Sequence, residues 1–252
     1  SISSSGLPRS SSPRCSVHRH TTLPAMVCDS DALVDAMTRT FEADVGDFTI
    51  VVEADDGVAL AAFRVWSSLL CSWSEVIAAM LGHAEMEEAR SRELHLRGFT
   101  QEAVEQFLRF LYTGRLTAEP SVLLEVAALA DKYHIVGLAD RIVKCTARLI
   151  TPQNACDLLS LALSLGVSQV IDAAMAMILR ETHLCFNRAY LLPVQLLDDI
   201  LSTEDLRISA YDLAMVLVSW AADDSAQRHL EPSAVRRLFE RHVRLAALTE
   251  SQ

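Results

Sequence analysis

The pattern of apolar and polar residues changes near the middle of the chain. In the first half, short apolar runs of strand length alternate with longer segments of helical spacing. A first helix is predicted from Asp29 to about Phe41, because apolar residues recur on one face there. Residues 48–52 and 58–63 predict two strands, and the sequence EADDG at 53–57 has the Asp-Gly chemistry of a tight turn. The chain is therefore expected to form a helix and then a β-hairpin.

The rest of the first half predicts helices and one more strand. Residues 66–81 are mostly apolar without strict alternation, which favours a buried helix or a broken pair of helices over a strand. The alternating stretch 93–96 predicts a short strand that returns to the sheet. Residues 101–112 predict a strongly amphipathic helix, and two further helices are predicted, one opening at Pro120 and one over 138–150.

The second half predicts helices alone. Thr151 and Pro152 have the chemistry of an N-cap and a first-turn residue, so a new helix is expected to begin there. Breaks are expected at 166–168, 186–187, 203–207 and 223–233, and they divide the remainder into about five or six helices. The predicted fold class is α+β, a small β-sheet flanked by helices and followed by an all-α domain.

Charge is unevenly spread and bears on the partners. The formal net charge is −11, and no acidic residue precedes Asp29, whereas three arginines do. An acidic body repels phosphate backbones, so nucleic acid is not an expected partner. Residues 1–28 are rich in Ser and Arg and are predicted to be a disordered leader. Two alternatives stay open for them, an organelle transit peptide and sequence upstream of a start at Met26.

No motif supports catalysis, a resident metal or a membrane span. The six cysteines form no CxxC pair and are expected to be buried free thiols in a reducing compartment. Neither a GxSxG elbow, nor a phosphate-binding glycine loop, nor an HExxH sequence occurs. No apolar run reaches the roughly 18 residues of a membrane helix. The expectation is a chain that is not an enzyme, needs no cofactor or membrane, and resides in the cytoplasm, the nucleus or both.

Two groups of residues have a functional and a plain interpretation. A ligand cage is one interpretation of the three tryptophans, but isolated aromatics among aliphatic residues are usually core fillers, which is what is predicted for Trp66, Trp73 and Trp220. Adjacent aspartates on a helix do not face each other. The pairs Asp198–Asp199 and Asp223–Asp224 are therefore predicted to be solvated and not catalytic.

Five short sequence motifs, taken in their order along the chain, resemble those of a known family. They lie between about Asp47 and Cys145 and read DFTIVV, FRVWSSLLCSWSEVIAAML, EMEEARSRELHL, FLRFLYTG and LADKY. The order and the sequences of these motifs resemble a BTB/POZ domain. The second half resembles a BACK domain through TPQNACDLLSLAL, the long apolar stretch from LLPVQ to SWAADD, and VRLAAL near the end. The resemblance implies a BTB/POZ domain at 29–149 and a BACK domain at 150–252.

The resemblance implies an adaptor that docks on a cullin-3 scaffold. The docking motif of such adaptors is a hydrophobic residue, any residue and then Glu, which here corresponds to Met86 and Glu88 in EMEE. An exposed Met side chain is apolar and flexible, so it can fit into a pocket of a partner, and a nearby carboxylate can accept hydrogen bonds from that partner. The alternative is that Met86 covers the local core while the glutamates are a solvated charge run. The first BACK helices, about 151–180, are expected to extend the contact.

A homodimer is also implied, through the helix that precedes the sheet. The predicted dimer-interface residues are Leu33, Val34, Met37, Phe41, Leu69, Leu70 and Val76. Packing inside the chain is the alternative for this apolar face. Only two of the 22 basic residues are lysines, so Lys132 and Lys144 are the predicted acceptors if the chain becomes ubiquitinated.

The chain departs from the family pattern in two respects. Where the family has His followed by Arg or Lys, this sequence has Trp66 and Ser67, so Asp47 is expected to lack a basic partner and a transcription-repressor role is disfavoured. No kelch repeat, MATH domain or zinc finger is found. The predicted function is a dimeric adaptor that brings an unknown protein substrate to a cullin-3 RING ubiquitin ligase. The alternative is a BTB–BACK dimerisation scaffold that binds no cullin.

Overall fold

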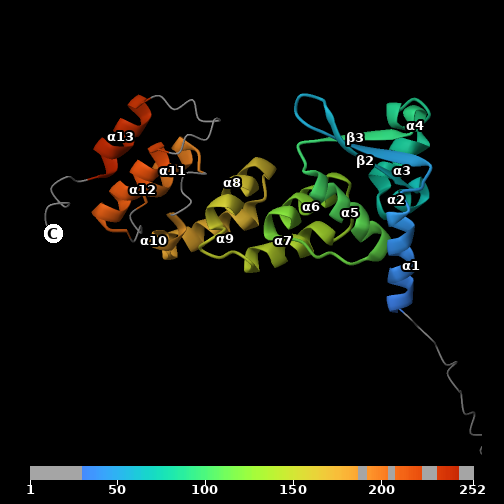
Figure 1. Ribbon diagram of the computed structural model, residues 1–252, viewed down its shortest axis with the longest axis horizontal. Helices are drawn as coiled ribbons and strands as arrows, with labels where there is room; N and C mark the ends of the chain where they lie inside the picture. The colour runs from blue at the N-terminus through green and yellow to red at the C-terminus, as the bar shows by residue number, and fades with distance from the viewer. Residues whose placement is uncertain (1–29, 187–191, 204–207, 223–231, 244–252) are drawn as a thin grey trace, which may run out of the picture.

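A computed structural model describes residues 30–186, 192–203, 208–222 and 232–243. The molecule is elongated, with the sheet near one end and helices alone toward the other (Figure 1). The elements around the sheet are α1 (Ser30–Glu42), β1 (Phe48–Glu53), β2 (Ala59–Val65), α2 (Ser67–Trp73), α3 (Glu75–Gly82), α4 (Glu87–Ser91), β3 (Glu93–Arg97), α5 (Gln101–Thr113), α6 (Pro120–Lys132) and α7 (Leu138–Arg148). Further helices follow, α8 (Ala155–Leu165), α9 (Ser168–Arg180), α10 (Thr182–Cys185), α11 (Val194–Leu201), α12 (Ala210–Ala222) and α13 (Pro232–His242).

The sheet has three strands in the order β2-β1-β3. β1 and β2 form the predicted antiparallel hairpin, and β3 returns parallel to β1 on its other side. The turn closes as the Asp-Gly sequence predicts: Gly57 has a φ of 82°, and the backbone N–H of Val58 donates to Asp56 Oδ1 at 3.1 Å. Gly46 lies so close to the backbone of Val65 that a Cβ there would be 2.1 Å from the carbonyl oxygen of Val65.

A first hydrophobic core fills the space between the sheet and helices α5 and α6. The buried face of β1 and β3 meets the apolar stripe of α5, and the buried residues on these elements include Phe48, Ile50, Leu96, Phe107, Leu108 and Leu111. The hydroxyl of Thr100 caps α5 by accepting from the N–H of Ala103, and Gly114 ends the helix in a left-handed conformation. The predicted amphipathic helix is thus confirmed.

Residues 66–81 form the broken pair of helices, α2 and α3, with Ser74 between them. The hydroxyl of Ser74 accepts from the backbone N–H of Ile77 at 3.0 Å and donates to the carbonyl of Tyr133 at 2.6 Å. Ser74 is buried, so these two bonds satisfy a polar group that would otherwise be costly. The charged segment that follows also contains a short helix, α4, which the sequence pattern did not predict.

The second half of the chain is helical throughout its described residues. A second core joins α8, α9, α11, α12 and α13, and Leu124 of α6 belongs to it, fully buried. The predicted helix start at Thr151 and Pro152 is wrong, because α8 begins at Ala155. The side chain of Asn154 makes a turn instead: its Oδ1 accepts from the N–H of Thr151 at 2.7 Å, and its Nδ2 donates to the carbonyl of Leu149 at 3.1 Å.

Candidate partner-binding surface

The loop before β3 presents Met86 on the surface. Met86 is the residue immediately before α4, and its side chain is 41% exposed. Its backbone is fixed, because its N–H donates to the carbonyl of His83 at 3.0 Å and its own carbonyl accepts from Arg90 at 3.3 Å. The anchored backbone needs no further ordering when Met86 enters a partner's pocket, so the conformational entropy lost would be that of the side chain alone, about 1.5–2 kcal/mol.

Glu88 is half-buried in the first turn of α4. Burial, and secondarily the negative charge of Glu88, raise the pKa of the Tyr133 phenol to about 12. The carboxylate of Glu88 therefore lies within electrostatic range of Tyr133, which stays protonated at neutral pH. Glu88 is thus close enough to Tyr133 of the first core to affect it and lies two positions after Met86, and its docking role stays a prediction.

A recess of about 410 Å³ adjoins this loop and is lined by acidic side chains from α4 and β3, with Glu53 of β1. Glu53 lies 2.6 Å from Arg97 Nε and 2.5 Å from His95 Nδ1, contacts that hold the pKa of the Glu53 carboxyl below its usual range. The carboxylate of Glu93 lies 3.5 Å from the other ring nitrogen of His95. The sequence analysis missed this cluster, although the alternation ELHLR places Glu93, His95 and Arg97 on one face of β3.

Asp47 has a basic partner, contrary to the prediction. Arg92 supplies it: Arg92 Nη2 lies 2.5 Å from Asp47 Oδ2, and Arg92 Nε donates to the carbonyl of Asp47 at 3.1 Å. The backbone N–H and the hydroxyl of Ser67 also donate to the Asp47 carboxylate, each at 2.7 Å. The backbone bond from Ser67 is the largest of the effects that hold the pKa of Asp47 below its usual range.

Sequence reasoning missed Arg92 because the residue is 45 positions away from Asp47. Arg92 ends α4 in a left-handed conformation with a φ of 61°, an uncommon conformation for a residue with a side chain. The family pattern places the cation directly after β2. In this chain Ser67 occupies that position and contributes a hydroxyl instead. The absence of a cation after β2 therefore does not disfavour a repressor role, because Arg92 provides the charge.

The apolar face of α1 is only partly used inside the chain. Leu33 is 63% exposed, Val34 is half-buried, and Met37 packs at the edge of the first core. Phe41 is buried, with its ring centroid 5.3 Å from that of Tyr112. Of the other predicted interface residues, Leu69 and Val76 are half-buried at the core edge, and Leu70 is fully buried. The dimer interface stays a prediction, with Leu33 as its most exposed member.

The two lysines lie on helices at the junction of the two cores. Lys132 ends α6 and Lys144 lies in α7, and both side chains are exposed. The ammonium of Lys132 sits 5.6 Å from the ring centroid of Phe99 and 5.7 Å from that of Tyr133, an arrangement that attracts the cation to both rings. Their predicted role as ubiquitin acceptors stays a prediction.

Two tryptophans, which were predicted to fill the core, are partly exposed. Trp66 is 43% exposed, and Trp73 is also partly exposed while its ring lies against Phe110 and its Nε1–H donates to the carbonyl of Leu111 at 2.8 Å. The side chain of Trp220 lies outside the described residues. Two cysteines, Cys156 and Cys185, are buried and form no disulfide, as predicted, and burial raises the pKa of the Cys185 thiol to about 11. Cys145, by contrast, is exposed.

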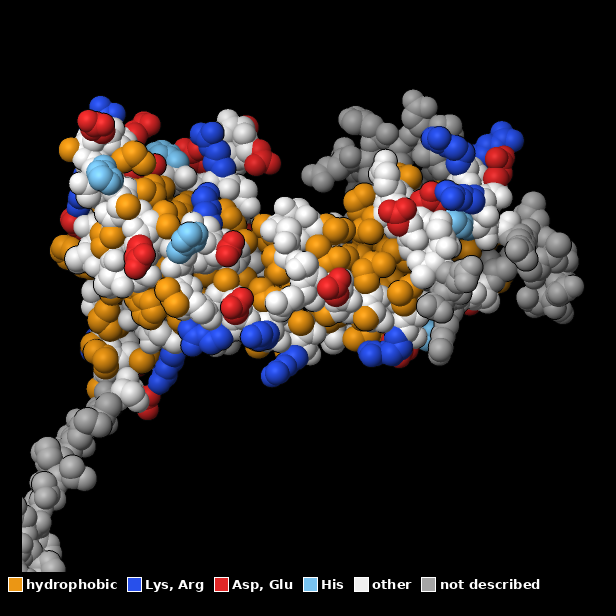
Figure 2. All heavy atoms as spheres, turned by 180° about the vertical axis from the view of Figure 1, so that it is seen from behind, with side chains coloured by type: hydrophobic (Ala, Val, Ile, Leu, Met, Phe, Trp, Pro, Cys, Tyr) orange, Lys and Arg blue, Asp and Glu red, His pale blue; other side chains and the backbone are white. Residues whose placement is uncertain are grey.

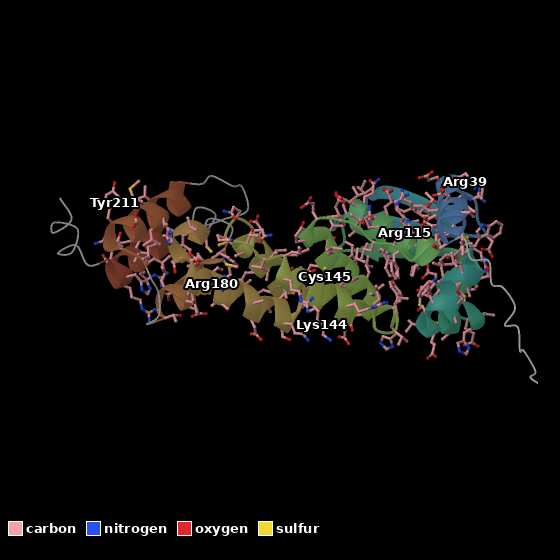
Figure 3. The ribbon with its side chains drawn as sticks, turned by 90° about the horizontal axis from the view of Figure 1, so that it is seen from below. Arg39, Arg115, Lys144, Cys145, Arg180 and Tyr211 are labelled. Atoms are coloured by element: carbon pink, nitrogen blue, oxygen red, sulfur yellow. The ribbon has the colours of Figure 1, made fainter. Side chains whose placement is uncertain are left out.

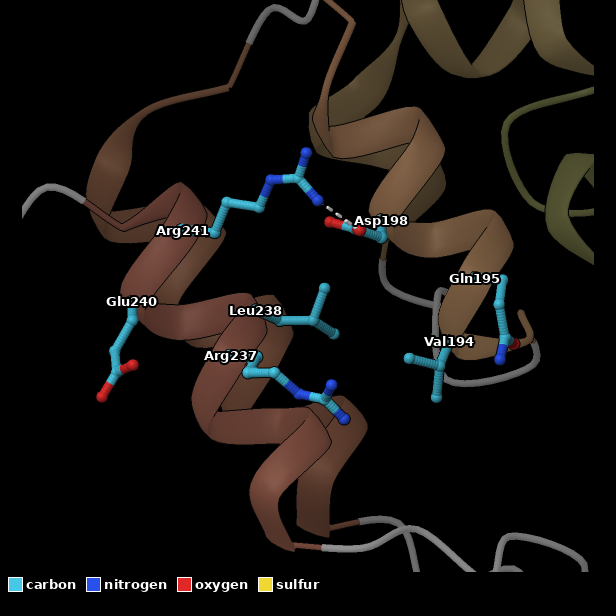
Figure 4. Close-up of a pocket in the computed structure, with 7 residues that line it drawn as sticks. All are labelled: Val194, Gln195, Asp198, Arg237, Leu238, Glu240 and Arg241. Atoms are coloured by element: carbon cyan, nitrogen blue, oxygen red, sulfur yellow. Dashed lines mark hydrogen bonds and ion pairs between the residues drawn. The ribbon is translucent and has the colours of Figure 1, made fainter.

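A cleft of about 580 Å³ lies between α11 and α13 (Figure 4). Asp198 of α11 is not solvated as predicted. It lies 2.7 Å from Arg241 Nη1 and 2.6 Å from His242 Nε2, so its carboxylate ties the two helices together. The pair Asp223–Asp224 falls outside the described residues. Because the side chains of Arg241 and His242 both hold Asp198 in this structural role, the residues described around the cleft show no set of converging groups available for chemistry.

The described residues contain neither a metal-binding cluster nor a membrane-spanning helix. No group of three or more His, Cys, Asp or Glu side chains is arranged to hold a metal ion. Within the same residues, no helix has both the length and the apolar character needed to cross a membrane.

Comparisons with known proteins give the first half a family. Residues 37–152 match the model of the BTB/POZ domain. The chain is 28% identical to human BTB/POZ domain-containing protein 9 over 199 residues, which cover 75% of this chain and 31% of that protein. It is 24% identical to human Kelch-like protein 11 over 197 residues, or 75% of this chain and 27% of that protein.

A shorter match is with BTB and MATH domain-containing protein 40 of Caenorhabditis elegans. The identity there is 32% over 97 residues, or 38% of this chain and 24% of that protein. The chain thus spans less than a third of the length of these relatives. No enzymatic family is indicated. Residues 37–152 are therefore a BTB/POZ domain, a module for protein–protein interaction.

Proposed function

We propose that this chain is a dimeric adaptor that recruits a cullin-3 RING ubiquitin ligase to a protein substrate. The observation that carries the proposal is the exposed Met86 on an anchored backbone, followed two positions later by Glu88. Within a BTB/POZ domain, this is the position and the pattern of the docking motif that the family resemblance implies. The chain supplies no chemistry; it raises the local concentration of substrate at the ligase.

The surroundings of Met86 support docking on a partner with a complementary surface. The recess beside it carries the carboxylates of Glu87, Glu88 and Glu93, and it favours a partner that brings basic groups to this edge. Insertion of the Met86 side chain into an apolar pocket would contribute about 1.5–3 kcal/mol by area burial. Local charge and an apolar plug together would give both orientation and affinity.

The first helices of the proposed BACK domain extend the same surface. α8 packs on α6 and α9 packs on α7, so the second half is docked directly on the BTB/POZ domain. A cleft of about 300 Å³ lies at this junction, between the α6–α7 pair and the turn that joins α8 to α9. Its walls combine small and aliphatic side chains, such as Ala127, Val143 and Leu165, with charged and polar ones, such as Asp131 and Gln169.

The dimer in this proposal forms through α1. Leu33 leaves an exposed apolar side chain beside the half-buried Val34 and Met37. A two-fold axis would bring the same patch of each copy together and bury Leu33. Two docking loops would then be presented by one assembly, so linked targets would bind with avidity.

Calorimetric titration of the chain with the N-terminal domain of cullin-3 tests the proposal. The unmodified chain is expected to bind, and Met86→Glu combined with Glu88→Ala is expected to abolish the heat of binding. Ala84→Glu combined with Glu85→Ala is the matched control, because it adds one carboxylate and removes one in the same loop, at exposed positions that precede the motif. Equal loss in both variants would point to loop charge alone and contradict the assigned site.

A scaffold that dimerises without cullin is the rival outcome. It would be supported if the unmodified chain gives no heat with cullin-3 while sedimentation shows a dimer that Leu33→Asp converts to a monomer. In that case Met86 would be a cover for the local core, and the adaptor function would be wrong.

A further inference from the structure

The exposed side of α7 carries a row of positive charge in a chain whose formal net charge is −11. Arg141, Lys144 and Arg148 follow one another at intervals of three and four residues, so they lie on one side of the helix. All three are exposed, and we name them the α7 basic row. The opposite side of the helix is buried through Leu138, Ile142 and Thr146.

The α7 basic row is not used inside the chain. Arg141 Nε donates to the carbonyl of Gly137 at 3.1 Å, and among the described residues none of the three cations forms an ion pair with a carboxylate. Asp140, on the same exposed side, lies one turn before Lys144 and makes no ion pair with it. Among the other exposed arginines, Arg115 pairs with Asp31 and Arg236 pairs with Glu240, whereas Arg39, Arg64 and Arg90 form no ion pair with a carboxylate in the described part of the chain.

Helix stability does not account for the row either. The helix dipole favours cations in the last turn, which explains Arg148 alone. Arg141 lies in the first turn, where the dipole opposes a positive charge, and Lys144 lies in the middle, where the effect is small. Two of the three cations therefore occupy positions that the helix itself does not favour.

The row lies in the middle of the molecule, accessible from outside. Figure 2 shows Lys and Arg side chains along one long edge of the helical body. Figure 3 shows Lys144 and Cys145 between the sheet end, where Arg39 and Arg115 lie, and the helical end, where Tyr211 lies. A partner could thus contact this edge while the loop at Met86 is occupied, because the two surfaces belong to different elements.

We infer that the α7 basic row is a docking surface for an acidic polypeptide segment. Arg141 and Arg148 are seven residues apart, or about 10 Å along a helix that rises about 1.5 Å per residue. An extended chain covers about 10 Å in three residues. The complementary segment therefore carries carboxylates three positions apart when extended, or seven apart when helical. This inference goes beyond the adaptor function, because it concerns what is recruited and not the scaffold.

A short acidic polypeptide fits better than other polyanions. A long nucleic acid would also approach the many carboxylates of this chain, and an acidic body repels phosphate backbones. Recognition of anionic lipid usually takes a cluster of about four to eight basic residues, more than α7 provides. A peptide with few charges engages the row without meeting the rest of the acidic surface.

The test is binding of the full chain to a fluorescein-labelled oligoglutamate peptide, followed by anisotropy. An oligolysine peptide of equal length, a single-stranded oligonucleotide and phosphatidylserine vesicles serve as competing probes. The test variant is Arg141→Gln, Lys144→Gln and Arg148→Gln, since glutamine keeps good helix propensity. The control variant removes the same charge from exposed positions on α4, the loop after α5, and α13: Arg90→Gln, Arg115→Gln and Arg236→Gln.

Oligoglutamate is expected to bind the unmodified chain at about 0.1 M salt and to be released at about 1 M, where the screening length falls to about 3 Å. The α7 variant is expected to weaken binding by about tenfold or more, the effect of losing roughly 1.4 kcal/mol, and the control by less than about twofold. The single variant Lys144→Glu, expected to weaken binding in the same direction, keeps the test decisive if the triple variant unfolds. Absence of oligoglutamate binding, equal loss in both triple variants, or tighter binding of the oligonucleotide or the vesicles would overturn the inference.

Discussion

The two cores of the molecule differ in how polar side chains bind them together. Around the sheet, hydrogen bonds join positions far apart in the chain: Ser74 with Tyr133, and the Tyr112 hydroxyl with the N–H of Trp66 at 3.0 Å. In the helical half, most described side-chain hydrogen bonds connect residues three or four apart, such as Thr182 with the carbonyl of Ile178. The contacts of Asp198 with α13 are exceptions.

This difference separates specific geometry from general packing. The loop that carries Met86 belongs to the region held by particular long-range polar bonds, so its position depends on individual side chains. The helical half is held mainly by apolar burial around α8 and α9, which tolerates conservative change better. Substitutions in the two regions should therefore lower the stability of the protein in different ways, through lost hydrogen bonds around the sheet and through lost apolar packing in the helical half.

The largest effect is expected at the lysines on the junction of the two regions. If the chain is ubiquitinated in the ligase complex, Lys132→Arg with Lys144→Arg should nearly abolish modification, because the sequence has no other lysine. Arginine keeps the charge but cannot form the isopeptide bond. A reconstituted ligation reaction followed by gel analysis is the measurement. Undiminished modification of the double variant would contradict the prediction.

Leu124→Ala tests whether the two cores unfold together. Leu124 lies on α6 but is buried in the second core, so its truncation should cost about 2–5 kcal/mol of unfolding free energy. Denaturation in urea is monitored by circular dichroism and by fluorescence in a Trp66→Phe, Trp220→Phe background, where Trp73 is the remaining tryptophan, and both signals should show one shifted transition. Leu163→Ala, on the exposed side of α8, is the control. A shift seen by circular dichroism alone would mean that the cores are independent.

Glu125→Ala tests how much one buried, long-range hydrogen-bond acceptor contributes to the stability of the first core. The buried carboxylate of Glu125 accepts from the backbone N–H of Thr100 at 2.7 Å and from its hydroxyl at 3.0 Å. Its loss leaves that N–H unsatisfied and should cost about 1–3 kcal/mol in thermal or chemical unfolding. Glu125→Gln keeps an acceptor and should cost less. Equal costs for both variants would show that the hydrogen bonds to Thr100 contribute little.

Asp47→Asn should have the smallest effect and a defined pH dependence. The pKa of Asp47 is depressed in the folded state, so its charge stabilises the fold above the ordinary aspartate pKa. This contribution disappears as the pH falls through the depressed pKa. Because Asp47 and Arg92 are each 44% exposed, solvent screening limits it to under about 1 kcal/mol. Unfolding curves of parent and variant should converge in acid; divergence there would contradict the assignment.

Much of the fold could be predicted because its signals are local. The hairpin at EADDG, the amphipathic α5 and the helical second half all follow from spacing and turn chemistry within a few residues. The start of α8 was misplaced because the side chain of Asn154, and not Thr151, organises that turn. α4 escaped prediction because five charged or small residues carry no apolar period.

The candidate site was predictable in part and for the same reason. The EMEE phrase identified a surface loop, and Met86 is exposed there. The partnership of Asp47 with Arg92 was missed because it depends on a left-handed residue at the end of α4, which no local pattern announces. Asp198 was misjudged in the same way, since its partners lie more than forty residues later on α13. Long-range charge pairing needs the three-dimensional fold.

The most direct test of the adaptor function observes Met86 itself during binding. The chain has seven methionines, and two of them have strongly exposed side chains in the described part, Met86 at 41% and Met215 at 48%. With methyl-labelled methionine, titration with the N-terminal domain of cullin-3 should shift or broaden the NMR signal of Met86. The signal of Met215, on α12, should stay unchanged. An unchanged Met86 signal at saturating cullin-3 would contradict the proposed docking site.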